Sequence, residues 1–397
     1  MSASWIILTS EYPPQPGGVS DFCKVLAHLL ARSGAAVEVW APTCESADRD
    51  SQEAIPGASH PVVTRRVPDL FGPSGRSRLA EALGSTHRGW RVLVQYVPNA
   101  FGLRGMNLPM CSWIARQRKR GADVRVLFHE PFFYFGWRRP QRNLLAVAHR
   151  IMAWRMLSNA VASYVSTPSW LPLLAPYQWL SNAPLRWLPF PATLPVVESP
   201  NEVSELRRNL APHREYLVGH FGTYGDDITR PLRPIVRELL KRNPGMRFVC
   251  VGRRSEQFAA ALSESEGLAR ARVLGTGTLD ERSTSLFLQA CDAMVQPYPD
   301  GATARRTSLI NLLAHGLPVV TTQGELSESF WQESQAVDLR TPGDVTGVCE
   351  AVQSISKDAA RTLALGFAAR RFHERHFSEA HLLSVLNTPL AASETNR

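Results

Sequence analysis

Short apolar runs alternate with longer amphipathic stretches along this chain, and glycine and proline mark the turns between them. Residues 4–9 and 37–41 are apolar runs typical of buried strands, and apolar positions recur at helical spacing from Phe22 onward. A loop containing Gly17 and Gly18 separates the first strand from this helix. The order strand, loop, helix, strand predicts a βαβ unit with its loop at the carboxyl end of the first strand.

The same pattern starts again after a proline-rich stretch at residues 186–200. Strands are predicted at residues 216–221 and 248–251, and helices at 232–242 and 344–371. The repetition predicts an α/β protein with two Rossmann-like domains.

The length of 397 residues also favours two domains over a single core. We predict an N-terminal domain at residues 1–190, completed by a C-terminal helix at about 377–390, and a C-terminal domain at residues 191–376. Because parallel sheets bind ligands at the carboxyl ends of their strands, we expect the domains to face each other across a ligand-binding cleft.

Residues 293–320 predict a strand, a loop, a helix, a turn and a second strand in succession. Asp300 and Gly301 form the turn of the loop, where glycine adopts a backbone angle that other residues resist. Apolar positions recur at helical spacing from Thr303 onward, and Gly316 stands where a glycine commonly ends a helix. This segment organises the C-terminal domain.

Arg305 and Arg306 fall in the first turn of the helix predicted from Thr303. A cation at that positive end of the helix dipole costs roughly 0.3–1 kcal/mol. Adjacent cations beside free helical N–H groups suit a phosphate instead. The pair therefore indicates a diphosphate site, and the alternative is two solvated arginines at a frayed helix end.

In the N-terminal half, Gly17 and Gly18 would let backbone N–H groups approach a ligand at the start of a helix. The alternative is a turn that simply requires two glycines. The spacing is not G-x-G-x-x-G, so the nicotinamide dinucleotide fingerprint is absent.

His129 and Glu130 directly follow a predicted strand at residues 124–128. A histidine and a carboxylate at the end of a parallel strand are placed like a catalytic dyad, and the aromatic residues 132–135 behind them suit stacking on a sugar or lipid. The alternative is a structural histidine in a loop.

Residues 138–163 combine apolar and aromatic residues with several arginines. Such a helix can lie on an anionic bilayer, although an ordinary core-facing helix with solvated arginines has the same pattern. Peripheral contact with an anionic membrane is therefore one option.

The net charge of +9 permits nucleic acid, an anionic membrane or phosphorylated small molecules as partners. The chain lacks zinc-finger spacing, an RRM-like motif and Lys-rich runs, so we expect no nucleic acid partner. The six cysteines form no C-x-x-C pair, and we expect reduced core residues and no metal site. Without a signal-peptide core or an apolar span, the expected location is the cytoplasm or the inner face of the cell membrane.

Several segments together resemble a GT-B glycosyltransferase of the large retaining family that uses nucleotide sugars. They are the early loop of Pro13, Pro14, Gly17 and Gly18, the strand-end His129, and the run at residues 314–320. The resemblance covers nearly the whole chain. It implies that the C-terminal domain holds the nucleotide and that basic side chains and helix N-termini hold the diphosphate without a metal. No cofactor is implied, because the nucleoside-diphosphate sugar is a co-substrate.

The family usually has two glutamates that are separated by seven residues, and the corresponding positions here are Thr303 and Asn311. The resemblance implies that Asn311 grips the ribose through its amide and that Thr303 offers a hydroxyl to the donor sugar. The Arg–Lys pair that usually follows the first strand of the C-terminal domain is replaced by a glycine turn at residues 222–225. Arg305 and Arg306 would supply the missing positive charge, with Arg230 and Arg253 as lesser candidates.

The expected reaction transfers a sugar from a nucleoside diphosphate to an acceptor hydroxyl with retention of configuration. Arg305 and Arg306 would stabilise the leaving diphosphate, His129 would line the donor sugar, and Glu130 would orient His129 or the acceptor. The donor-binding residues are expected at the glycine turns and strand ends, namely Gly17, Gly18, Gly222, Thr223, Arg253, Asp300, Gly301, Thr303, Thr307 and Asn311.

The acceptor is expected to be a glycan, a lipid-linked glycan or a small molecule, in polysaccharide, glycolipid or glycoconjugate biosynthesis. Two alternatives remain for the function itself. One is a GT-B scaffold that has lost catalysis and binds a partner, and the other is a nucleotide-sugar epimerase of the same fold. Product analysis with a panel of donors separates the three.

Overall fold

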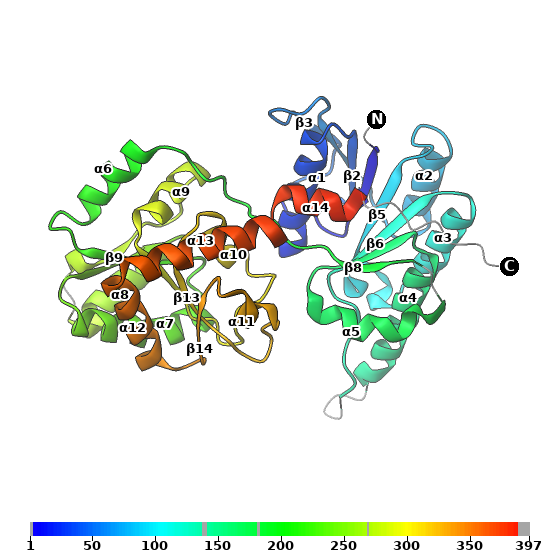
Figure 1. The fold of residues 1–397 in the computed structure, drawn as a ribbon. Helices are drawn as coiled ribbons and strands as arrows, with labels where there is room; N and C mark the ends of the chain where they lie inside the picture. The colour runs from blue at the N-terminus through cyan, green and yellow to red at the C-terminus, as the bar shows by residue number, and fades with distance from the viewer. Residues whose placement is uncertain (1–2, 137–140, 181–182, 268–269, 388–397) are drawn as a thin grey trace. The chain divides into compact units, whose positions relative to one another are not determined.

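The computed structural model describes residues 3–136, 141–180, 183–267 and 270–387. The chain divides into two compact units (Figure 1). The N-terminal unit contains the residues up to Pro189 and those from Leu382 onward, and the C-terminal unit runs from Phe190 to His381.

The N-terminal unit contains a sheet of eight strands in the order β3-β4-β2-β1-β5-β6-β7-β8. All neighbouring strands are parallel except β3 and β4. The strands are β1 (Trp5–Leu8), β2 (Val37–Ala41), β3 (Ser51–Glu53), β4 (Val62–Arg66), β5 (Arg91–Tyr96), β6 (Asp123–Phe128), β7 (Ala162–Val165) and β8 (Leu185–Trp187). The strand order reverses between β1 and β5, which is where ligands of such sheets bind.

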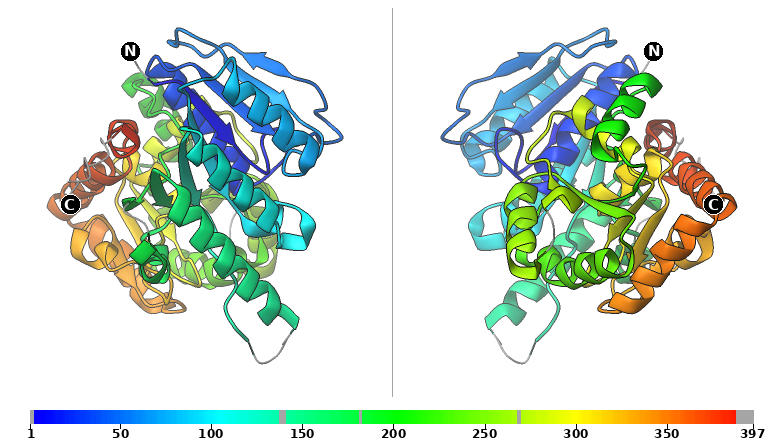
Figure 2. Two further views of the ribbon diagram at one scale, coloured as in Figure 1. Left: turned by 90° about the vertical axis from the view of Figure 1, so that its right-hand side faces the viewer. Right: turned by 90° about the vertical axis from the view of Figure 1, so that its left-hand side faces the viewer.

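Helices cover both faces of this sheet. They are α1 (Gly18–Arg32), α2 (Pro73–Gly84), α3 (Leu108–Lys119), α4 (Gln141–Asn159), the short α5 (Leu171–Leu174) and α14 (Glu379–Asn387). In Figure 1, α1 and α14 lie to the left of the sheet, and α2, α3 and α4 lie to its right. Figure 2 shows α4 along the surface of this unit.

The C-terminal helix α14 is anchored by the N-terminal unit. Arg125 on β6 is 3% exposed and donates to the carbonyl of Leu386 at 2.7 Å. Arg91 on β5 donates to the Asn387 side chain at 2.9 Å. Residues 388–390 of the helix predicted at about 377–390 lie outside the described residues.

The C-terminal unit contains a parallel sheet of six strands in the order β11-β10-β9-β12-β13-β14. Its elements are α6 (Pro200–Leu210), β9 (Tyr216–Phe221), α7 (Asp226–Arg242), β10 (Met246–Val251), α8 (Ser255–Glu266), β11 (Val273–Gly275), α9 (Glu281–Ala290), β12 (Ala293–Gln296), α10 (Thr307–Ala314), β13 (Val319–Thr322), α11 (Phe330–Ser334), β14 (Asp338–Arg340), α12 (Val345–Lys357) and α13 (Ala359–His376). The order reverses between β9 and β12, so the loops after these two strands are the expected ligand-binding loops.

Apolar side chains of α7, α8 and α12 form one core with the sheet, in which Val218, Leu239 and Val352 are fully buried. The two parallel α/β units confirm the fold class that the repeated pattern predicts. None of the described helices combines the length and the apolar content that crossing a bilayer requires.

Three predicted helix boundaries in the C-terminal unit are wrong. Helix α10 begins at Thr307 and not at Thr303, because the preceding residues form a loop that is bonded to other loops. Helix α7 begins at Asp226 and includes two prolines. Its earlier start is stabilised by two aspartates in the first turn, because negative side chains interact favourably with the positive end of the helix dipole. The helical stretch predicted at 344–371 is two helices, and the side chain of Asp358 caps the second at the N–H of Arg361.

Candidate functional site

The loop between β12 and α10 lies at the carboxyl end of the sheet of the C-terminal unit, and contact with a neighbouring loop determines its path. Gly301 has a φ of 93°, which confirms that a glycine is needed at this turn. A Cβ on Gly301 would lie 2.3 Å from the nitrogen of Gly324 and 2.2 Å from the hydroxyl of Ser327. The N–H of Leu326 also donates to the carbonyl of Asp300 at 3.1 Å. Two loops therefore meet backbone to backbone, and glycine is what allows it.

Arg306 in this loop already has partners within the unit. Its guanidinium forms an ion pair with Asp300 and lies 4.6 Å from the ring centre of Tyr298. Arg305 is exposed. The two arginines precede α10 instead of lying in its first turn, and Arg306 is the N-cap residue. They still stand beside the N-terminus of the helix, where an anion is favoured.

The first turn of α10 presents two hydroxyl side chains, those of Thr307 and Ser308. The N–H of Thr307 donates to the carbonyl of Arg305 at 3.1 Å. The hydroxyls of Ser308 and Tyr298 lie 2.8 Å apart. Burial raises the pKa of Tyr298 to about 12, so its phenol is neutral and can share a proton with Ser308.

Glycines bring the loops after β9 and β10 next to this helix start. A Cβ on Gly222 would lie 4.0 Å from the Cβ of Ser308, and a Cβ on Gly252 would lie 2.2 Å from the carbonyl oxygen of Gly222. Thr223 and Arg253 are exposed on these loops. The structure thus brings Gly222 and the first turn of α10 together.

Other arginines at this edge are also exposed. Arg230 lies on α7, and Arg254 has a left-handed backbone with a φ of 68° at the start of α8. Strained non-glycine residues of this kind concentrate at functional sites.

His220 is buried beneath the glycine turn. Its side chain is 1% exposed, and burial lowers its pKa to about 3. The ring lies edge-on to Tyr224 with 4.9 Å between centres. A neutral imidazole at this position supports the turn from below and adds no positive charge to the site.

Glu328 is a feature of this edge that the sequence analysis did not identify. Its carboxylate is 8% exposed and accepts from the N–H of Ala304 at 3.1 and 3.2 Å and from the indole N–H of Trp331 at 2.8 Å. Thr303 is the residue before Ala304 and is itself buried. A carboxylate from another loop therefore lies beside the position where the family's first glutamate would stand.

Asn311 on α10 is buried and binds the segment that enters the C-terminal unit. Its side-chain oxygen accepts from the backbone N–H groups of Thr193 and Leu194 at 2.8 and 3.0 Å. Its amide N–H donates to the hydroxyl of Thr193 at 3.0 Å. The amide that was expected to grip a ribose holds this segment in the structure.

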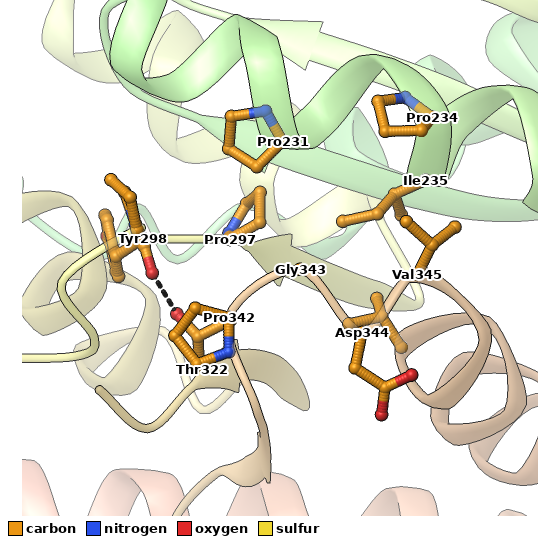
Figure 3. Close-up of a pocket in the computed structure, with 12 residues that line it drawn as sticks. Pro231, Pro234, Ile235, Pro297, Tyr298, Thr322, Pro342, Gly343, Asp344 and Val345 are labelled. Atoms are coloured by element: carbon orange, nitrogen blue, oxygen red, sulfur yellow. Dashed lines mark hydrogen bonds between the residues drawn. The ribbon is translucent and has the colours of Figure 1, made fainter.

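A small cavity also lies at the carboxyl edge of this sheet. Figure 3 shows Pro231 and Pro234 of α7 on one side and Pro342 and Thr322 on the other. Its volume is about 120 Å³. Ligand pockets usually measure about 300–1,000 Å³, so this cavity is too small for a nucleoside diphosphate.

In the N-terminal unit, the carboxylate of Glu11 packs against the loop that contains Gly17 and Gly18. Glu11 accepts from the N–H groups of Val19 and Ser20 at 3.1 Å each. A Cβ on Gly17 would lie 2.5 Å from the same carboxylate, whereas a Cβ on Gly18 would meet nothing within 4 Å. The group that closely approaches Gly17 is therefore the Glu11 carboxylate, which accepts hydrogen bonds from the N–H groups at the start of α1.

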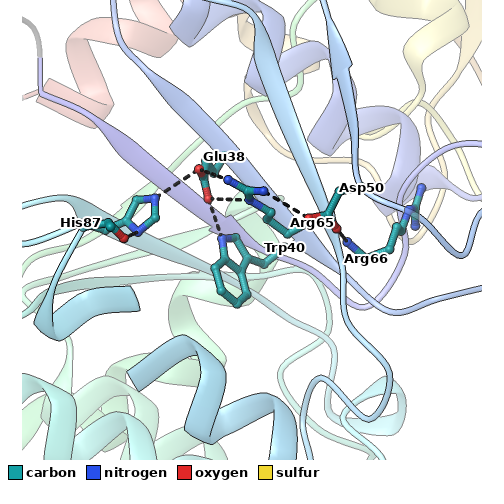
Figure 4. A network of polar contacts seen from close by, with 7 residues as sticks. Glu38, Trp40, Asp50, Arg65, Arg66 and His87 are labelled. Carbon is teal, nitrogen blue, oxygen red and sulfur yellow. Dashed lines mark hydrogen bonds and ion pairs between the residues drawn. The ribbon is translucent and has the colours of Figure 1, made fainter. Parts of the chain in front are cut away.

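A buried polar network holds the loop before α1 in place. Arg66 donates to the carbonyls of Pro13 and, at 3.1 Å, Pro42. Figure 4 shows two neighbouring carboxylates. Asp50 lies beside Arg65 and Arg66. Glu38 lies beside Arg65, His87 and Trp40. Burial opposes ionisation of Glu38, but hydrogen bonds from Arg65 and His87 outweigh it and hold the pKa of Glu38 below its usual range.

His129 lies at the end of β6, as predicted from the strand pattern, and is 8% exposed. Its Nε2 lies 2.7 Å from the side-chain oxygen of Gln95, a buried residue on β5 that the sequence analysis did not identify. Phe22 of α1 lies edge-on to the imidazole at 5.4 Å. Glu130 is exposed. Adjacent strands thus supply a histidine and an amide at the carboxyl edge of this sheet.

Comparisons with known proteins agree with this architecture. Residues 216–358 match the family model described as Glycosyl transferases group 1. No curated protein sequence matches the chain.

Solved structures of similar fold cover nearly the whole chain. Sucrose-phosphate synthase from Thermosynechococcus elongatus is 19% identical, with 96% of this chain and 97% of that chain covered and a TM-score of 0.63. HepE of Anabaena in complex with UDP and glucose is 16% identical, with 97% and 98% covered and a TM-score of 0.61. The trehalose-6-phosphate synthase OtsA is 11% identical, with 98% and 99% covered and a TM-score of 0.65. At these identities the likeness shows the fold, which is GT-B.

Proposed function

We propose that this protein, a glycosyltransferase with a group 1 domain at residues 216–358, transfers a sugar from a nucleoside diphosphate to an acceptor hydroxyl. The main observation in support of a donor-binding site is that Gly222, the first turn of α10 and Arg306 lie together at one sheet edge. We call this group of residues the donor site. HepE, a structure of the same fold, binds UDP and glucose, so a UDP-sugar is the first donor to test.

In this reaction the acceptor oxygen forms a bond to the anomeric carbon, and the bond from that carbon to the diphosphate oxygen breaks. The acceptor proton passes to the leaving diphosphate. Negative charge develops on the diphosphate as it leaves, and fixed cations and N–H groups stabilise such charge in a preorganised site.

Arg305 and Arg306 would serve the leaving group, together with the hydroxyl groups of Thr307 and Ser308 and the backbone N–H of Ser308. This proposal requires no metal, because basic side chains and the N-terminus of α10 would stabilise the negative charge of the diphosphate. The pairing of Arg306 with Asp300 holds the guanidinium in place before a donor binds. Glu328 would fix the loop that carries both arginines through Ala304.

We propose retention of the anomeric configuration and a place in polysaccharide, glycolipid or glycoconjugate synthesis, as the resemblance implies. His129 and Glu130 would act on the sugar or acceptor side, with Gln95 holding His129. A His129→Ala variant that transfers sugar as fast as the wild type would remove the histidine from this role.

We also propose peripheral contact with an anionic membrane through α4. Leu144, Val147 and Ile151 lie at helical spacing and are 69%, 43% and 40% exposed. Arg142 is exposed near the start of the same helix. This combination of apolar and basic residues suits an anionic bilayer surface. The full chain should sediment with vesicles of anionic phospholipid and not with neutral ones, and equal sedimentation with both would contradict the proposal.

The test of the enzymatic function is a thermal-shift screen followed by product analysis. UDP should raise the melting temperature of the full chain, because a ligand of the folded state stabilises it by mass action. A panel of UDP-sugars with mixed acceptors should then yield a glycoside and free UDP. Stabilisation by UDP without turnover would indicate a scaffold, and an isomerised donor would indicate an epimerase.

A further inference from the structure

A second cavity lies at the carboxyl edge of the sheet in the N-terminal unit and is not used by the donor site. It has a volume of about 430 Å³ and is bounded by the loop between β4 and α2 and the loop between β5 and α3. This volume falls within the range of about 300–1,000 Å³ that is usual for small-molecule sites. This cavity is therefore large enough for a small-molecule ligand, whereas the cavity beside α7 is too small.

The two loops that form the walls are tied together by one buried side chain. Asn107 donates its amide N–H groups to the carbonyls of Phe71 and Phe101 at 3.1 and 2.6 Å, and its oxygen accepts from the N–H of Met110 at 3.0 Å. The rings of Phe71 and Phe101 are stacked, with 4.7 Å between centres. The cavity is thus formed before a ligand arrives, which lowers the entropic cost of binding.

One wall presents an apolar side chain to solvent on a strained backbone. Leu103 lines the cavity, is 61% exposed and has a φ of 48°, and the adjacent Arg104 has a φ of 54°. Left-handed backbone is unfavourable for a leucine, and exposure of its side chain contributes nothing to folding. Binding of an apolar group would bury this side chain and so account for its exposure in the free protein.

The opposite wall carries two charged groups. Asp69 has a φ of 51°, and its carboxylate lies where a Cβ on residue 72 would be, only 1.9 Å from the ideal position. Gly72 therefore makes room for the carboxylate, which also accepts from the hydroxyl of Ser74 at 3.3 Å. Arg76 is half-buried in the same wall. Opposite charges that nearly cancel suit the hydroxyls of a neutral sugar better than a phosphate.

We propose that this cavity binds the acceptor, and that the acceptor is amphipathic. Hydroxyls of a sugar or polyol head bind Asp69 and Arg76, and an apolar chain or ring joined to that head lies against Leu103. This assignment depends on the proposed transfer reaction for the identity of the ligand as an acceptor. It names the chemical class that the reaction leaves open.

The test compares two glucosides that differ only in the apolar group. Octyl β-D-glucoside, kept below its micelle concentration, and methyl β-D-glucoside are titrated into the full chain, with binding followed by saturation-transfer NMR. Two buried methylene groups are worth about 1.6 kcal/mol, so the octyl glucoside should bind about tenfold more tightly or better. Equal affinities would overturn the apolar part of the proposal.

Leu103→Asn removes the apolar group and keeps a residue that tolerates the left-handed backbone. It should weaken octyl glucoside binding about fivefold to tenfold and leave methyl glucoside binding unchanged. Leu363→Asn is the matched control, since Leu363 is 74% exposed on α13 in the other unit. An equal loss in both variants would show non-specific association of the alkyl chain and overturn the proposal.

UDP binding, measured on the same samples, separates this proposal from the donor site. If UDP binds and octyl glucoside binding does not depend on Leu103, the cavity assignment fails and the donor site stands. If UDP does not bind and octyl glucoside binding depends on Leu103, the proposed transfer from a UDP-sugar fails and the amphipathic site stands.

Discussion

The carboxyl edges of the two sheets both belong to mainly parallel strands, but their chemistry differs. In the C-terminal unit, Gly222, Gly252 and Gly301 close the loops backbone to backbone and leave exposed cations around them. In the N-terminal unit, Asn107 ties two loops together beside a mainly apolar cavity with one charge of each sign. The parallel sheet determines where ligands bind, and the loops determine which ligand is bound.

The two units also differ in the titratable groups that they bury. The N-terminal unit buries Glu38 in its ionised form, with Arg65 and His87 as partners. The C-terminal unit buries His220 and half-buries His373, and their pKa values fall to about 3 and about 4 because burial disfavours the charged imidazole. Burial also lowers the pKa of His149 in the N-terminal unit, so the contrast lies between the buried carboxylate Glu38 and the buried histidines.

The largest expected effect is on the rate of sugar transfer when an arginine at the carboxyl edge of the C-terminal sheet is replaced. Arg306→Gln should lower kcat/KM for a UDP-sugar about 100- to 1,000-fold, because one group that stabilises developing charge is lost. Arg305→Gln should cost less, because Arg305 is exposed and lacks the ion pair that holds Arg306. Steady-state kinetics with a fixed acceptor measures both.

Arg208→Gln is the control for these variants, since Arg208 is exposed on α6. It should retain the wild-type rate. If Arg306→Gln also stays within about twofold of the wild type, the guanidinium does not serve the leaving group, and the contrast between the two edges loses its functional meaning.

The next effect is on the backbone contact between loops. Gly301→Ala should destabilise the C-terminal unit by roughly 2–4 kcal/mol, because the new Cβ adds a clash with Gly324 to the left-handed strain. Gly89→Ala should cost only about 1–2 kcal/mol, since Gly89 has a φ of 85° but nothing within 4 Å of the new Cβ. Urea unfolding of both variants provides the comparison, and equal losses would mean that the loop contact is not tight.

The acid response should depend on the buried His220 more than on Glu38. The pKa of His220 is lower in the folded state than in the unfolded state, so its neutral form stabilises the fold fully above pH 6.5 and less as the pH falls. At pH 5 the loss is about 2 kcal/mol for this histidine. His220→Phe should therefore lose less stability than the wild type between pH 7 and pH 5 in urea unfolding.

Glu38 provides the contrast in the N-terminal unit. Its pKa is lowered in the folded state, so its contribution is present above the ordinary pKa of a glutamate and is lost only as the pH falls through the lower folded value. Glu38→Gln should leave the change in stability between pH 7 and pH 5 unaltered. A wild-type slope in His220→Phe would show that another group controls the acid response.

The smallest effect concerns strain at the apolar cavity. Leu103→Gly should stabilise the N-terminal unit by about 0.5–1 kcal/mol, because glycine accepts the left-handed backbone and little burial is lost. Thermal unfolding should show a small rise in melting temperature. A fall would mean that the leucine side chain packs more than its exposure indicates.

Local patterns in the sequence were enough to predict several of the strands and turns. The run at residues 216–221 forms β9, and the glycines at 301 and 316 have the positive φ angles expected of them. The run at 124–128 places His129 at the end of β6. These features depend on side-chain periodicity and on backbone sterics, which act between neighbours in the sequence.

The partners of the candidate site residues were not predictable in the same way. Glu328 reaches Ala304 from the loop after β13, Gln95 reaches His129 from β5, and Asn311 holds residues far before it in the chain. No spacing rule connects such positions, because only the packing of distant segments brings them into contact.

The sequence by itself therefore determined the two α/β units, the loops at the strand ends and the surplus of arginine, since each follows from short-range preference or composition. Only the tertiary structure decided that α10 starts after Arg306 and that Glu11 accepts from the N–H groups at the start of α1. It also decided that glycines close the loops at one sheet edge while the other edge has the larger cavity. Those outcomes depend on hydrogen bonds and contacts between loops, whose geometry exists only after the strands have been ordered side by side.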